Sequence, residues 1–177
     1  MCPTPEPQHS PGVTLVDVDE LVLEQLLSLA HRDASPDEVA PPLGGPGWNP
    51  ERTAWFRNYH REAAAGLDGD AGEKSWAVFS GGNAAGSVRL KRVAPAEVPT
   101  AETGIWLGRS FRSRGVGTAA LALVLDYARR AGLSRVTART LAGNRAAQRL
   151  LASAGCRLTP DDDGTVLAVV DLSSDWQ

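Results

Sequence analysis

The hydrophobic and polar positions divide the chain into short alternating stretches and longer stretches with helical spacing. Apolar residues recur at every second position in some segments, as at Val136 and Ala138, and at intervals of three and four in others, as at Val116, Ala120 and Leu123. The first spacing is typical of a half-buried strand and the second of an amphipathic helix. Together they predict the element order β-α-α-β-β-β-α-β-α-β-β.

Turn and cap residues set the expected limits of these elements. Asp17 and Asn49 are favoured helix N-caps, and Pro50 suits a first helical position. We expect strands at residues 13–16, 75–80, 85–93, 100–107, 135–141, 156–158 and 165–172, and helices at 18–32, 50–63, 116–131 and 144–154. Residues 33–50 are rich in proline and glycine and are expected to form a loop, of a length that is usually either functional or disordered.

Antiparallel strands followed by a β-α-β crossover predict a twisted mixed sheet with helices on both faces, an α/β (α+β mixed) fold. The chain has 177 residues, which is enough for one domain with its own core. We assign that domain to residues 13–174. Residues 1–12 are polar and proline-rich, and we expect them to form a disordered tail.

Charge and composition exclude several classes of partner. The formal net charge of −3 provides no general attraction to nucleic acid or to an anionic membrane. No apolar run approaches membrane length, and residues 1–12 lack the apolar segment of a signal peptide. The two cysteines, Cys2 and Cys156, lie at opposite ends of the chain, so a disulfide framework is not expected. We therefore expect a cytoplasmic protein, and we assign no metal ligands.

The most informative stretch is residues 104–131, which reads as a strand, a turn and a helix. The turn contains Arg112, Gly115 and Gly117. Glycines allow the backbone to approach an anion, and the first turn of a helix offers free N–H groups at the positive end of its dipole. The stretch lacks the lysine of the P-loop and the triple-glycine spacing of dinucleotide-binding folds. It therefore predicts a phosphate-binding turn of another kind.

This turn resembles the acetyl-CoA motif, R/Q-x-x-G-x-G/A, of the GNAT N-acetyltransferases, and the segment RSRGVG at 112–117 matches it in full. The segment from Asn144 to Cys156 resembles a second landmark of that family, N-x-x-[AS]-x-x-x-[YL]-x-x-x-G-F, with cysteine in place of phenylalanine. The predicted order of elements is also the GNAT order. The two segments are most similar to those of the RimJ/RimL-like branch, which acetylates protein N-termini and has relatives that acetylate small amines and antibiotics.

The resemblance implies acetyl-CoA as the cofactor. Backbone N–H groups of residues 113–118 would hold its pyrophosphate, the main chain of Ile105 and Leu107 would pair with the pantetheine arm, and Asn144 would bond that arm near the thioester. The residues assigned to the cofactor are Ile105, Trp106, Leu107, Arg112, Ser113, Arg114, Gly115, Val116, Gly117, Thr118 and Asn144. As alternatives, the arginines are solvated surface residues, the glycines form only a tight turn, and Asn144 is only a helix N-cap.

The reaction that the resemblance implies requires a neutral amine, whose proton a positioned carboxylate can take. Glu102 lies on the central strand, where many relatives carry a glutamate base, and strand alternation places it on one face with Gly104 and Trp106. The alternative is an exposed glutamate at the start of a strand. Leu151 and Ala147 occupy positions where relatives carry a tyrosine or a serine, so the sequence identifies no proton donor.

The acceptor is expected to be a primary amine of a small molecule or of a peptide N-terminus. Its wall would come from the first two helices and the loop between them. Acidic and aromatic side chains there would suit a cationic amine, and the candidates are Asp37, Glu38, Trp48, Trp55 and Tyr59. As alternatives, Trp55 and Tyr59 belong to the core, and His31 and His60 are surface residues.

Two other functions remain open at this point. One is a GNAT-fold protein that binds acyl-CoA as a sensor or interaction module without turnover. The other is an unrelated nucleotide-binding domain, which the absent lysine and the absent acidic ribose ligand disfavour. A homodimer is also left open.

Overall fold

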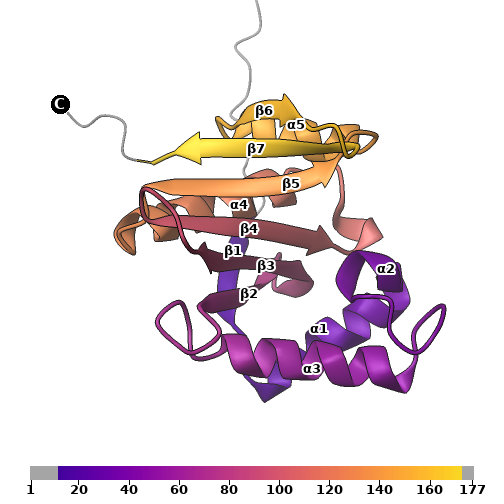
Figure 1. Ribbon diagram of the computed structural model, residues 1–177. Helices are drawn as coiled ribbons and strands as arrows, with labels where there is room; N and C mark the ends of the chain where they lie inside the picture. Colours follow the sequence, from indigo (N-terminus) through magenta and orange to yellow (C-terminus); the bar gives the residue numbers. More distant parts are fainter. Residues whose placement is uncertain (1–11, 173–177) are drawn as a thin grey trace, which may run out of the picture.

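In a computed structural model that describes residues 12–172, seven strands form one twisted sheet (Figure 1). The strands are β1 (Val13–Asp17), β2 (Glu73–Ser80), β3 (Asn83–Val93), β4 (Thr100–Leu107), β5 (Arg135–Leu141), β6 (Arg157–Pro160) and β7 (Thr165–Asp171). Their spatial order is β1-β2-β3-β4-β5-β7-β6. The β4–β5 pair is parallel, and the other strand pairs in this part of the chain are antiparallel.

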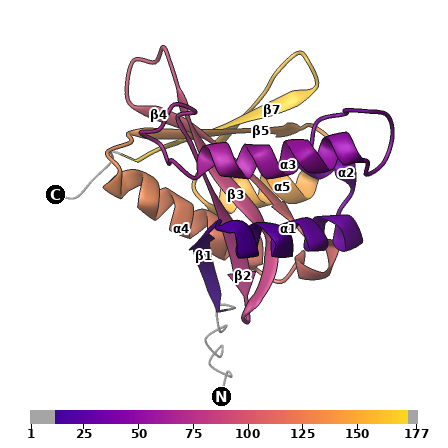
Figure 2. The same ribbon diagram turned by 90° about the horizontal axis from the view of Figure 1, so that it is seen from below.

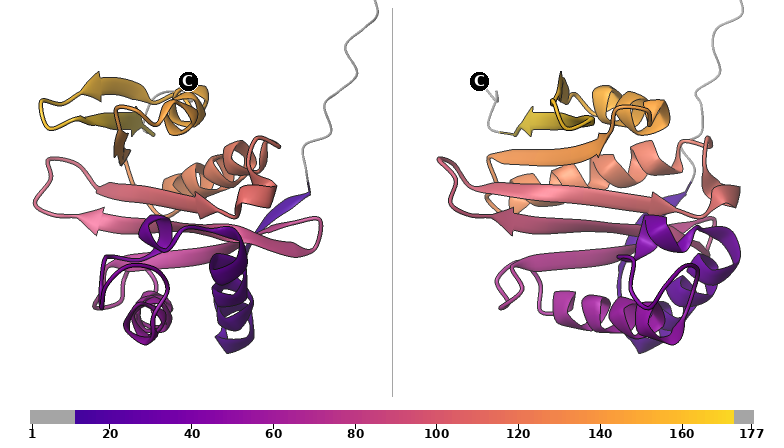
Figure 3. Two further views of the ribbon diagram at one scale, coloured as in Figure 1. Left: turned by 90° about the vertical axis from the view of Figure 1, so that its right-hand side faces the viewer. Right: turned by 45° about the vertical axis from the view of Figure 1, so that its right-hand side comes forward.

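Helices cover both faces of this sheet, as predicted. The helices are α1 (Glu20–Asp33), α2 (Pro36–Val39), α3 (Pro50–Ala63), α4 (Val116–Arg130) and α5 (Arg145–Ser153), and a single 3-10 turn, η1 (Arg109–Phe111), follows β4. Figures 2 and 3 show α1 and α3 side by side on one face and α4 on the opposite face. The mixed α/β fold and the predicted order of the main elements are confirmed; α2 and η1 are additions.

Each face has its own apolar cluster, because each covering helix presents a helical stripe of buried side chains. On one face Leu23 and Leu26 of α1 meet Phe56 of α3 over the sheet. On the other face α4 contributes the largest stripe, which includes Ala120 and Val124. These two clusters hold the sheet between the two helix layers.

Some expected limits were wrong. The N-cap of α1 is Asp19, whose Oδ1 accepts the Val22 N–H at 2.8 Å; Asp17 ends β1 and pairs with Lys74. The predicted 33–50 loop contains α2, which begins at a proline after a serine cap, a start signal that sequence reasoning overlooked. Residues 1–11 and 173–177 lie outside the described part of the chain, so the predicted tail falls there except for Gly12.

The central feature is the divergence of β4 from β5. The two strands pair over three positions, from Thr100 with Arg135 to Glu102 with Thr137, and β4 then continues to Leu107 beside β3 alone. Figure 1 shows the two ribbons separating towards their carboxyl ends. The Gly108 N–H donates to Ala85 on β3 at 2.9 Å. Strand alternation therefore turns the backbone groups of Ile105 and Leu107 towards the open side.

Candidate active site

A groove of about 680 Å³ follows the open side of β4 and reaches the start of α4. One wall is the carboxyl half of β4 and the turn after it, and the other is α5. The residues that line it are Glu38, Ile105, Trp106, Leu107, Arg112, Ser113, Gly115, Gly117, Thr118, Asn144, Ala146, Ala147, Arg149, Leu150 and Ser153. Nine of the residues that the sequence assigned to the cofactor are therefore gathered around one groove.

The turn at the floor of the groove is shaped to bind an anion. Ser113 and Gly115 both have left-handed backbone conformations, with φ of 61° and 78°, which is costly for a serine and free for a glycine. No side chain caps α4. The helices α1, α3 and α5, in contrast, are each capped by a side-chain oxygen, those of Asp19, Asn49 and Asn144. The first N–H groups of α4 are consequently left for an outside acceptor.

Arg112 has a role that its position in the motif did not predict. Its Nε and Nη2 donate to the Leu107 carbonyl oxygen at 3.1 and 2.9 Å, and Nη2 also donates to Glu38 Oε2 at 2.8 Å. The hydrogen bond from Arg112 lowers the pKa of Glu38. Nearby, Asp33 Oδ2 accepts the Ser110 N–H at 3.0 Å. The carboxyl end of α1 and the short α2 thus hold the turn after β4 in place.

Two of the predicted cofactor residues do not line the groove. Arg114 is exposed outside its wall, and the Val116 side chain is buried in the core, where it is 1% exposed. Asn144 does line the groove and also caps α5, since its Oδ1 accepts the Ala147 N–H at 3.1 Å. Leu151 lies in the core. This position, where relatives carry a tyrosine, therefore offers no proton donor in this protein.

Sequence reasoning missed most of the α5 wall. Ala146, Arg149, Leu150 and Ser153 all line the groove, and Arg149 adds a cation that no motif position predicted. A signal was present, because these residues recur at intervals of three and four on the helix after Asn144. Gly117 faces this wall closely, since a Cβ added there would lie 3.3 Å from Leu150 Cδ2.

Glu102 lies beyond the end of the groove, on the face of β4 that α1 and α3 cover. Its Oε1 accepts a hydrogen bond from Arg89 Nη2 at 2.7 Å. Arg89 Nη1 lies 3.7 Å from Glu73 Oε1, and Glu73 in turn accepts the Tyr59 hydroxyl at 2.8 Å. Tyr59, Glu73, Arg89 and Glu102 thus form one chain of contacts, which we call the β-face network. Sequence reasoning found only its two ends, Tyr59 and Glu102.

The predicted acceptor residues are found in several places. Trp55 stacks on Tyr59 with ring centroids 5.2 Å apart, both half-buried. Asp37 Oδ1 lies 2.9 Å from Nη1 of the buried Arg52, and Glu38 faces the groove. Trp48 packs on His31 at 4.5 Å. Tyr59, Trp55 and Glu38 therefore lie close to β4 or the groove. Trp48 instead lies against His31, near the carboxyl end of α1.

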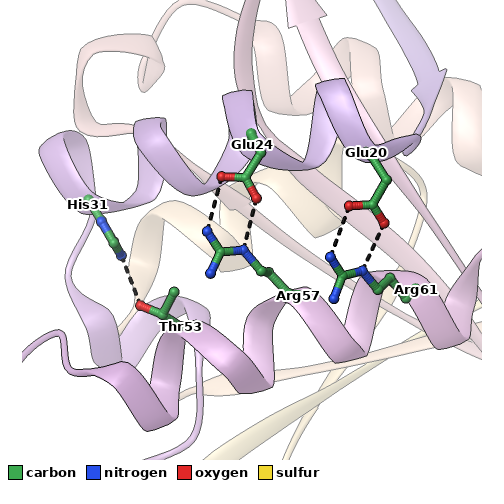
Figure 4. A network of polar contacts seen from close by, with 6 residues as sticks. All are labelled: Glu20, Glu24, His31, Thr53, Arg57 and Arg61. Carbon is green, nitrogen blue, oxygen red and sulfur yellow. Dashed lines mark hydrogen bonds and ion pairs between the residues drawn. The ribbon is translucent and has the colours of Figure 1, made fainter.

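The two histidines differ from each other. His31 is exposed, as expected, and contacts Thr53 beside the ion pairs Glu24–Arg57 and Glu20–Arg61, which join α1 to α3 (Figure 4). His60 was expected at the surface and is instead 2% exposed. Its Nδ1 lies 2.8 Å from Ser75 Oγ, and burial lowers its pKa to about 4. His60 is therefore a neutral residue of the α3–sheet interface.

Within residues 12–172 no helix has the length and apolar character needed to span a bilayer. The same part of the chain holds no cluster of three or more histidine, cysteine, aspartate or glutamate side chains suited to a metal ion.

Comparison with known proteins agrees with this geometry. Residues 14–157 match the family model of the acetyltransferase (GNAT) domain, and no curated protein sequence matches the chain. Among solved structures, RimL, a ribosomal L7/L12 alpha-N-protein acetyltransferase in complex with coenzyme A, is 17% identical with a TM-score of 0.73, over 96% of this chain and 98% of that one. Mycobacterium smegmatis RimJ in complex with CoA-disulfide is 21% identical with a TM-score of 0.68, over 90% and 81%.

A third similar structure is Campylobacter jejuni N-acetyltransferase PseH in complex with acetyl coenzyme A, which is 14% identical with a TM-score of 0.61, over 91% of this chain and 99% of that one. At these identities the structures show a shared fold. The family match covers most of the chain, and the protein belongs to the GNAT acetyltransferase family. It is an acetyl-CoA-dependent N-acetyltransferase.

The residues present fit acetyl-CoA. The uncapped start of α4 and the left-handed turn before it offer N–H groups to a diphosphate. The backbone of Ile105, beyond the end of the β4–β5 pairing, offers peptide-like partners to the amides of pantetheine, whereas the Leu107 carbonyl oxygen is already bound by Arg112. Small residues on α5, Ala146 and Ala147, leave room for the arm between the two walls.

Proposed function

We propose that this protein transfers the acetyl group of acetyl-CoA directly to a primary amine held beside the divergence of β4 from β5. The acceptor is an antibiotic-like or metabolic small molecule, or a protein N-terminus. The observation that supports this most strongly is the layout of β4. Its carboxyl half borders an anion-binding groove, and its amino half carries a partly exposed carboxylate, Glu102, three residues before Ile105.

In this proposal the groove orients the cofactor. N–H groups of residues 113–118 would bind the diphosphate, and the open edge of β4 would hold the pantetheine arm. Acetyl-CoA supplies an activated acyl group and a good leaving thiol. Holding the amine and the acyl carbon in contact converts a bimolecular step into an intramolecular one, which is a large part of such a catalyst's effect.

Glu102 has the role of general base. It accepts a proton from the attacking amine, directly or through one water, so that the nitrogen lone pair is free to attack. Its contact with Arg89 fixes the carboxylate on the strand face it shares with Gly104 and Trp106. No side chain at position 147 or 151 donates a proton to the departing sulfur, which therefore receives one from water or from the amine. We place this activity in the cytoplasm.

The test is release of CoA thiol from acetyl-CoA with a panel of amines that includes peptides with different N-termini, amino sugars and diamines. We expect at least one class to raise thiol release well above hydrolysis, and mass spectrometry to show a gain of one acetyl group on the acceptor nitrogen. Tight CoA binding by calorimetry with no turnover on any amine would contradict the proposal and favour a binding module. Binding of ATP or NAD in preference to CoA would contradict the cofactor assignment.

A further inference from the structure

Arg89 lies at the centre of the β-face network, and no motif position accounts for it. It stands opposite Gly104 in the β3–β4 register, and its guanidinium crosses that glycine, because a Cβ added at Gly104 would lie 3.0 Å from Arg89 Nε. The glycine therefore makes room for the arginine. The side chain reaches Glu102 at 2.7 Å and remains 31% exposed.

The donors of Arg89 are not all used. A guanidinium carries five N–H donors. The contacts found among the described residues are one hydrogen bond to Glu102 and an approach to Glu73 at 3.7 Å, which exceeds hydrogen-bond distance. Since the side chain is partly exposed, its other donors are available to a group from outside the chain.

The charges of the network indicate what that group is. Glu73 and Glu102 are carboxylates and Arg89 is a cation, so the three together carry one formal negative charge. Lys91 stands opposite both Glu73 and Glu102 in the strand registers, but its side chain is exposed and none of the ion pairs found in residues 12–172 includes it. Arg139 on β5 is paired with Asp161, and Tyr59 stays neutral because burial raises its pKa. A cationic amine cancels the negative charge, whereas an acceptor that also carries a carboxylate restores it.

We propose that Arg89 is a specificity-determining residue of the acceptor site, which donates to a neutral carbonyl or hydroxyl oxygen on the carbon next to the amine-bearing carbon. Arg89 and Glu102 are in direct contact, so two groups that bind them must be close neighbours on the acceptor. A vicinal amine and oxygen meet that condition. The preferred class is thus α-amino amides, 2-amino alcohols and related compounds. This inference rests on the proposed function, because it takes Glu102 as the residue beside the amine.

The experiment compares alaninamide with 3-methylbutan-2-amine, which has the same branched skeleton with methyl groups in place of the amide oxygen and nitrogen, and with alanine. For each enzyme the ratio of kcat/KM for alaninamide to that for the alkylamine is measured at one pH by thiol release. Comparing this ratio between enzymes removes the difference in basicity of the two amines. We expect the wild type to favour alaninamide over alanine, and Arg89→Gln to lower the alaninamide-to-alkylamine ratio about tenfold or more, as for loss of a hydrogen bond from a charged donor.

Arg92→Gln is the matched control. Arg92 is an arginine on the same strand with similar exposure, and it pairs with Asp68 outside the network. It should leave the ratio unchanged. An equal fall for both acceptors in Arg89→Gln would overturn the inference, because Arg89 would then only position Glu102. An unchanged ratio would overturn it too.

A second variant avoids removing a charge. Gly104→Ala places a methyl group against the guanidinium, and it should lower the same ratio while acetyl-CoA binding is retained; an unchanged ratio here contradicts the inference even if Arg89→Gln fails to fold. Failure of the proposed function is distinguishable, since the wild type would then bind acetyl-CoA by calorimetry and release no thiol with any amine of the panel.

Discussion

The two ends of β4 are built by different means. Around its carboxyl end the groove is formed mainly by backbone groups and small residues from two short segments, 105–118 and 144–153. Around its amino end the β-face network joins side chains from four elements that are far apart in the chain, α3, β2, β3 and β4. The first arrangement suits a cofactor common to a whole family. The second arrangement depends on the identity of individual side chains, so single substitutions can change it, and it suits recognition of a particular acceptor.

The largest expected effect is on CoA binding in the groove at the carboxyl end of β4. Gly117 lies in the first turn of α4, buried and close to Leu150. Gly117→Glu would place a bulky anion where the diphosphate approaches, so we expect loss of measurable CoA binding by calorimetry. Gly117→Ala adds only a tight methyl group and should weaken binding far less. Thermal melting of both variants checks that the fold is intact. Wild-type affinity in Gly117→Glu would contradict the assignment of the phosphate site.

The next largest effect is expected at the amino end of β4, where a substitution should lower the rate of acetyl transfer without changing CoA binding. Glu102→Gln keeps the shape of the side chain and removes its charge, so we expect kcat/KM to fall by about 10²–10⁴-fold near neutral pH, the usual range for general acid–base assistance. The rate should recover partly at higher pH, where free amine is abundant, and CoA affinity should not change. Glu97→Gln, an exposed glutamate on the β3–β4 connection, is the control. A wild-type rate at all pH values would place the base elsewhere.

A third test concerns the stability of the interface between α3 and the sheet, where His60 is buried. Burial lowers the pKa of His60 from 6.5 to about 4, so below pH 6.5 the unfolded chain binds a proton that the folded chain does not. Stability from this residue is therefore lost as the pH falls from 6.5 to about 4, by about 3 kcal/mol in total. Denaturant titrations should show a smaller loss over this range in His60→Gln. The same change at the exposed His31 should alter the pH dependence little, and equal pH dependence in all three proteins would refute the burial argument.

The smallest effect is expected in the wall of the groove, at the carboxyl end of β4. Glu38 places a carboxylate in the wall of an anion site and takes up part of Arg112. Glu38→Gln should therefore tighten CoA binding, by only about two- to threefold because both side chains are partly exposed and the interaction is screened. Asp37→Asn, a matched change on the same short helix but outside the groove wall, should have no effect on CoA affinity. Weaker CoA binding in Glu38→Gln would instead show that the pair with Arg112 is needed to shape the turn.

The sequence by itself determined the element order, the sheet with helices on both faces and most of the residues that line the groove from β4 to α4. These depend on local signals, such as alternation in β4, a glycine turn directly before α4 and the Asn144 cap of α5, and each acts within a few residues. One local signal was misinterpreted: the structure shows that Asp19, and not Asp17, caps α1.

Only the tertiary structure decided which side chains meet in the β-face network and around Arg112. That Arg89 crosses Gly104 to reach Glu102, that Glu73 is nearly buried beneath Tyr59, and that Glu38 holds Arg112 all depend on pairs separated by 13 to 74 positions. A charged residue has no periodic signature that names its partner, because its partner is set by strand register and helix packing rather than by its neighbours in the chain. His60 shows the same limit: its burial follows from how α3 rests on β2, which its polar sequence context did not indicate.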